Sequence, residues 1–218
     1  MTDISSLIYQ IVIPEFSRTL FMVFSATAIS AAIGFLLAIL LTVSHKDGLR
    51  PNRYLYHALD TTINIVRSFP FIILIVAIIP LTRAIVGTSI GEKAAIVPLT
   101  IAGAPFIARL VEGSLREVDK ELIQAAKSFG ASNFQIIFRI MIPEAVPSII
   151  SGITLAIVAI LGCTAMAGAV GAGGLGAVAI TYGYANFDNT VMYGTVFFLI
   201  ILVQVIQSAG NYLYKVLK

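Results

Sequence analysis

The sequence predicts an all-α integral membrane protein with about five transmembrane helices. Of the 218 residues, 58% are hydrophobic and only 11% are charged, whereas an ordinary soluble domain carries about 25% charged residues. The mean hydropathy is +0.97. A soluble fold of this length needs a polar surface that this composition cannot supply. We therefore expect residues 1–218 to form a single transmembrane domain.

Five apolar segments approach the roughly 20 residues that a helix needs to cross a bilayer. The first is free of charge from Thr19 to Ser44. The third contains Pro98 and Pro105, which remove backbone donors and predict a kink or a break. The uncharged stretch 145–187 is too long for one helix, so a glycine-rich re-entrant segment or loop is expected after the fourth span. The predicted spans are residues 19–44, 59–79, 90–110, 148–168 and 190–212.

The distribution of Lys and Arg predicts an N-out, C-in orientation, because basic residues mark the cytoplasmic side of a membrane. In this orientation the cytoplasmic segments hold Lys46, Arg50, Arg53, Arg109, Arg116, Lys120, Lys127, Arg139, Lys215 and Lys218. The external segments hold only Arg18, Arg83 and Lys93. Arg67 is expected in the inner part of the second span.

One cytoplasmic loop, at about residues 109–147, carries much of the charge and is expected to hold two helices. Its first half has apolar residues at the spacing of one helical face, namely Leu115, Val118, Leu122, Ala125 and Ala126. Gly130 interrupts this pattern, and Ser132 or Asn133 can cap a second helix. Two prolines are expected to end that helix before the fourth span, Pro143 and Pro147.

The segment QAAKSFGASNFQIIFRIMIP, residues 124–143, lies in this loop. It resembles the cytoplasmic signature of permease subunits of ATP-binding cassette (ABC) importers, in which an E-A-A triplet is followed by a spaced Gly and by I-x-L-P. The matching residues are Gln124, Ala125, Ala126, Gly130, Ile140, Ile142 and Pro143. Two positions depart from the signature: Gln124 replaces the usual Glu, and Ile142 replaces Leu. Because Gln124 has no charge, an ion pair to a partner at this position becomes a weaker, neutral hydrogen bond. The resemblance implies that these residues couple the membrane domain to an ATPase.

Four further segments extend the resemblance over most of the chain: RSFPFIIL (67–74), PLTRAIVGTSIG (80–91), AAIVPLTIAGAPFIARLVE (94–112) and GAVGAGGLG (168–176). Together they resemble permeases of methionine importers. The resemblance implies a type I importer permease fold and a homodimer in the bacterial inner membrane. Two ATPase subunits and an extracytoplasmic methionine-binding protein would be its partners.

The same resemblance implies that this chain is not an enzyme. ATP and Mg²⁺ would be bound by the partner ATPases, and this chain would hold no cofactor or metal. The implied substrate is L-methionine, with D-methionine as a further candidate. No nucleic-acid partner is expected, since the chain has no long basic run.

Three glycines, Gly171, Gly173 and Gly176, have the G-x-G-x-x-G spacing of dinucleotide-binding folds. That motif requires a preceding strand and a βαβ unit, whereas a predicted span precedes these glycines. Two interpretations stay open: close packing of helices in lipid, or irregular backbone along a translocation path. The candidates for lining such a path are Cys163, Met166, Gly171 and Gly173.

Alternative functions are a permease for another amino acid or small solute, a secondary carrier or channel, and a membrane scaffold. Coupling to ions is disfavoured, because no charged residue lies at the centre of a clear span. Asp60 is expected in a capping or interfacial role, and Glu112 and Arg116 have the spacing of a helix-stabilising pair.

Overall fold

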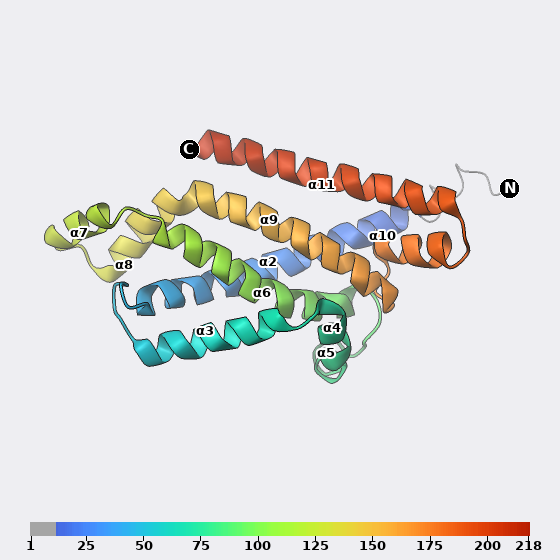
Figure 1. Cartoon of the computed structure of the whole chain (residues 1–218), viewed down its shortest axis with the longest axis horizontal. Helices are drawn as coiled ribbons and strands as arrows, with labels where there is room; N and C mark the ends of the chain where they lie inside the picture. The colour runs from blue at the N-terminus through green and yellow to red at the C-terminus, as the bar shows by residue number, and fades with distance from the viewer. Residues whose placement is uncertain (1–11) are drawn as a thin grey trace.

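The computed structural model describes residues 12–218, and all regular structure in that range is helical. Four helices are long and apolar enough to cross a membrane, and a bent pair, α3–α4, brings the number to five. They form an elongated bundle (Figure 1). The elements are α2 (Ile13–Ser44), α3 (Arg53–Ser68), α4 (Phe71–Ala77), α5 (Ile79–Val86), α6 (Glu92–Arg116), α7 (Lys120–Ser128), α8 (Asn133–Ile136), the π-helix η2 (Ile137–Met141), α9 (Ile142–Ala169), α10 (Gly174–Ala177), the π-helix η3 (Val178–Tyr184) and α11 (Asn189–Leu217).

The two ends of the bundle differ. At one end, here called the α7 end, α7 and α8 project beyond the long helices (Figure 1). At the other, here called the glycine end, α10 lies beside the start of α2 (Figure 1). The centre is the pair α2 and α6, with α9 packed on both. At Gly34 an added Cβ would lie 2.8 Å from the carbonyl oxygen of Ala104, so these two helices approach as closely as small residues allow in lipid.

The second predicted span is wrong as a continuous helix. The chain bends by 101° between α3 and α4. Pro70 explains the bend, because it has no N–H and disfavours helical backbone at the residue before it. Phe69 is indeed extended, with ψ 127°. Arg67 consequently lies in the last turn of α3, directly before the break; its position within the membrane stays a prediction.

The third span was expected to be kinked or broken, and it is not broken: α6 runs from Glu92 to Arg116 with Pro98 and Pro105 inside it. Both prolines are buried within the bundle, where neighbouring helices tolerate the lost backbone bonds. The helix also continues into the loop expected to start at residue 109. The single apolar face expected from Leu115 onward is therefore interrupted after Arg116, and α7 begins anew at Lys120.

The prolines expected to end the second loop helix do not end it. The helical path is continuous from Asn133 to Ala169. The π-helix η2 precedes Pro143, which occupies the first turn of α9, the position where a missing N–H costs least. The glycine-rich loop predicted after the fourth span is present over residues 170–173, followed by α10 and η3.

Candidate functional site

The candidate coupling segment is α7 with the turn that follows it. Asp119 starts α7 by accepting a hydrogen bond from the Glu121 N–H at 2.8 Å. Every residue of the helix is exposed or half-buried. Ile123 and Ala126 pack against the bundle core, whereas Leu122 is 42% exposed and Phe129 is 92% exposed. The outer side of α7 is therefore mostly polar, with exposed apolar side chains at Leu122 and Ala125 and at Phe129 directly after the helix.

Gly130 makes the reversal after α7 possible. Its φ is +78°, in the left-handed region that glycine adopts without strain. The Gly130 N–H donates to the Lys127 carbonyl at 3.0 Å, and the Ala131 N–H donates to the Ala126 carbonyl at 3.1 Å. This pair of bonds is a Schellman motif. The prediction of a glycine reversal here is confirmed.

Ser132 then caps α8, as the sequence indicated. Its hydroxyl accepts from the Gln135 N–H at 3.3 Å, and the Gln135 side chain accepts from the Ser132 N–H at 2.8 Å. This reciprocal capping box fixes the start of the second helix. The rings of Phe134 and Phe138 lie 4.5 Å apart and are both substantially exposed, which extends the apolar surface beyond α7.

The seven candidate coupling residues are not all on one surface. Gln124, Ala125 and Gly130 are exposed near the tip of α7. Gln124 also lines a cavity of 260 Å³ between α7 and the loop after α2. Of the others, Ala126, Ile140 and Ile142 are half-buried and Pro143 is exposed at the start of α9. The sequence comparison did not single out Phe129; a lone aromatic residue directly before the turn glycine is the signal that could have identified it.

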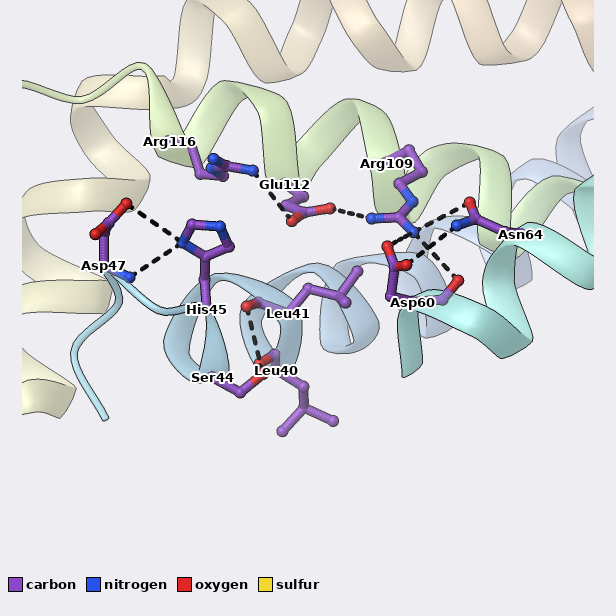
Figure 2. A network of polar contacts seen from close by, with 10 residues as sticks. All are labelled: Leu40, Leu41, Ser44, His45, Asp47, Asp60, Asn64, Arg109, Glu112 and Arg116. Atoms are coloured by element: carbon purple, nitrogen blue, oxygen red, sulfur yellow. Dashed lines mark hydrogen bonds and ion pairs between the residues drawn. The ribbon is translucent and has the colours of Figure 1, made fainter. Parts of the chain in front are cut away.

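A network of charges joins α3 to α6 (Figure 2). The Arg109 guanidinium binds the Asp60 carboxylate and lies 2.8 Å from Oε2 of Glu112 and 3.2 Å from Oδ1 of Asn64. Arg116 lies 3.7 Å from Oε1 of Glu112, so the predicted pair between these two residues is confirmed. The Glu112 side chain is only 5% exposed. The link between Asp60 and Arg109 was missed, because 49 residues separate them in the sequence.

The glycine run at the opposite end is held against α2. The Glu15 carboxylate accepts a hydrogen bond from the Gly174 N–H. The Thr19 hydroxyl accepts one from the Leu175 N–H at 2.8 Å. A further backbone bond, 2.9 Å long, joins the Gly91 N–H to the carbonyl of Gly171. These contacts give the glycine run a packing role.

The four candidates for a translocation path all lie toward the glycine end. Met166 is 49% exposed on α9, and Cys163, one turn earlier, is half-buried against the core. Gly171 is exposed in the loop, whereas Gly173 lies against the side chains of Glu15 and Arg18. Their role in a path stays a prediction. Among residues 12–218, no three His, Cys, Asp or Glu side chains are grouped as a metal site requires.

A family model for the inner membrane component of binding-protein-dependent transport systems matches residues 34–218. The chain belongs to this family. It is therefore an inner-membrane component of a bacterial transport system, and its helices are those of an ABC transporter permease.

Named relatives and solved structures agree with this assignment. The chain is 50% identical over 198 residues to a probable D-methionine transport system permease protein, MetI, of Vibrio cholerae, covering 91% of this chain and 88% of the relative. It is 44% identical to the methionine import system permease protein MetP of Bacillus subtilis, covering 82% and 80%. An inward-facing structure of the MetNI methionine ABC transporter superposes with a TM-score of 0.95 at 42% identity, covering 97% of this chain and 98% of that one. The type I importer fold is thereby confirmed.

Proposed function

We propose that this chain is the transmembrane permease of an ATP-driven importer for methionine. The observation that carries the proposal is the 50% identity, over 91% of the chain, to a probable D-methionine transport permease. The fit to a methionine ABC transporter along nearly the whole chain supports it. L-methionine is the expected substrate and D-methionine a second one.

The proposed assembly contains two copies of this chain, two ATPase subunits and an extracytoplasmic methionine-binding protein. The N-terminus lies outside and the C-terminus inside, so the α7 end is cytoplasmic. The ATPases dock on α7, whose outer side carries exposed Leu122 and Phe129. The binding protein docks at the glycine end. The ATPase subunits bind ATP and Mg²⁺ and hydrolyse the ATP, and this chain catalyses no reaction.

Coupling follows from how α7 is attached. The helix reverses at Gly130 and then joins α9 through the continuous helical path that begins at Asn133. A displacement of α7 by the ATPase is thus transmitted along a rigid element into the membrane. The charge network of Arg109 and Glu112 keeps α3 attached to α6 while the bundle moves.

The experiment is reconstitution of this chain with its ATPase and binding protein in proteoliposomes. We expect uptake of radiolabelled L-methionine that requires ATP inside and the binding protein outside, and competition by D-methionine. Competition by histidine or glutamine but not by methionine would instead assign the chain to another amino-acid importer. Uptake that continues without ATP would assign it to a carrier or channel.

A further inference from the structure

One side of α3 carries polar residues along its whole length, at intervals of three and four residues: Arg53, His57, Asp60, Asn64 and Arg67. Residues at this spacing share one side of a helix. All of them are exposed except Asp60, which is half-buried in the charge network. The middle of this stripe faces α6, where Asp60 and Asn64 bind Arg109. With the residues that the structure describes, Arg53, His57 and Arg67 make no such contact, and because exposing charges to lipid is costly, they face water or a second copy of the chain.

Arg67 lies at the end of this stripe farthest from Arg53, and Arg53 is predicted to lie at the cytoplasmic surface. It follows Arg53 by 14 residues, which corresponds to about 21 Å along a helix against a hydrocarbon thickness of about 30 Å. Its side chain is exposed, and within the described part of the chain no carboxylate lies at ion-pair distance from it. A cation at this depth is thus available for an anionic group that passes through the membrane.

The backbone beside the positively charged Arg67 carries partial negative charge, from carbonyl oxygens at the end of α3. The helix ends at Ser68, Phe69 donates its N–H to the Val66 carbonyl at 3.3 Å, and Pro70 has no N–H to donate. The last turn therefore keeps carbonyl oxygens without helical donors, at the negative end of the helix dipole. Broken helices at membrane depth place such carbonyls where they can bind a cationic group. Phe69, 48% exposed, adds an apolar surface.

We propose that the α3–α4 break is a transient binding site for the zwitterionic amino acid during its passage. The Arg67 guanidinium binds the α-carboxylate, the terminal carbonyls of α3 face the α-ammonium, and Phe69 contacts the apolar side chain. This inference rests on the proposed function, in that the passing solute is an amino acid. It adds a residue that selects for the α-carboxylate inside the membrane.

The test uses the complete transporter in proteoliposomes, with uptake and ATP hydrolysis measured on the same sample. Arg67→Gln is expected to lower uptake by about tenfold or more, since it removes a charged hydrogen-bonding partner, while binding-protein-stimulated ATP hydrolysis stays near the wild-type rate. Arg67→Lys keeps the charge and should restore part of the uptake. Arg53→Gln, on the same side of α3, is the matched control and should leave both rates unchanged.

Two results would overturn the inference. One is wild-type uptake by Arg67→Gln. The other is a parallel loss of uptake and ATP hydrolysis in both Arg67 variants, because that pattern indicates a structural or coupling role. The proposed function is tested separately by the wild-type transporter: if that carries a different amino acid, methionine is wrong, and the Arg67 variants are then measured with the amino acid that is carried.

Discussion

Nη1 of Arg109 lies 2.8 Å from Oε2 of Glu112, one turn further along α6. The same guanidinium reaches Asp60 on α3, so Arg109 joins two helices (Figure 2). It is also the nearer of two arginines that face the nearly buried Glu112, the other being Arg116 at 3.7 Å. Removing one partner of a buried ion pair leaves the other charge uncompensated, which costs about 3–5 kcal/mol.

Arg109→Gln should therefore destabilise the permease strongly, by several kcal/mol. The measurement is the heat-induced loss of the monodisperse peak of the solubilised protein in size-exclusion chromatography. Asp60→Asn should cost less, because Asp60 is 30% exposed and exposed pairs contribute only about 1 kcal/mol or less. Glu144→Gln, at an exposed position of α9, is the control. If the Arg109 variant and this control lost their monodisperse peak at the same temperature, the network would not stabilise the fold.

The Gly130 turn should be essential for coupling and not for insertion. Gly130→Trp places a bulky side chain at a φ of +78°, which costs about 1–2 kcal/mol of strain and would obstruct the surface on which we propose that the ATPase docks. We expect normal membrane insertion and loss of methionine uptake. Gly130→Asn is the matched variant, because asparagine tolerates left-handed backbone, and it should retain most uptake. Normal uptake by Gly130→Trp would remove this turn from the coupling mechanism.

The sequence identifies the membrane class and the approximate spans, because hydropathy over 20 residues depends little on neighbouring helices. The effect of each proline is not predictable in this way. Pro70 breaks a helix, whereas Pro98 and Pro105 lie inside an unbroken one. The difference lies in tertiary surroundings: the two prolines of α6 are buried between other helices, and these contacts are not visible in a local pattern.

The candidate sites likewise divide into features that a local sequence pattern predicts and features that depend on tertiary contacts. The glycine reversal and the serine cap after α7 are local, and both were predicted correctly from Gly130 and Ser132. The contact between Asp60 and Arg109 joins residues on different helices, so spacing along the chain gives no signal for it. The exposure of Phe129 likewise depends on how α7 projects from the bundle.

Phe129 should contribute to docking of the ATPase. It is 92% exposed at the end of α7, and burying an aromatic side chain at an interface contributes about 1.5–3 kcal/mol. Phe129→Ala is expected to weaken the affinity for the ATPase, and hence its co-purification, by about tenfold or more, because each 1.4 kcal/mol corresponds to about a factor of ten in affinity. Tyr212→Ala, equally a truncation of an exposed aromatic residue but on α11, should leave co-purification unchanged. Full retention of the ATPase by the Phe129 variant would place the docking surface elsewhere.

The glycine run should be required for the packing of the glycine end. Gly174 has a φ of +83°, and an added Cβ would lie 2.8 Å from the Thr19 hydroxyl and 2.9 Å from the Met22 side chain. Gly87 has the same φ but nothing within 4 Å of an added Cβ. Gly87→Ala therefore measures backbone strain alone, whereas Gly174→Ala adds overpacking of about 1–3 kcal/mol. The expected result is a lower thermal midpoint for Gly174→Ala than for Gly87→Ala, with a further loss when Glu15→Gln weakens the bond to the Gly174 N–H. Identical midpoints for the two alanine variants would mean that α2 does not hold this loop in place.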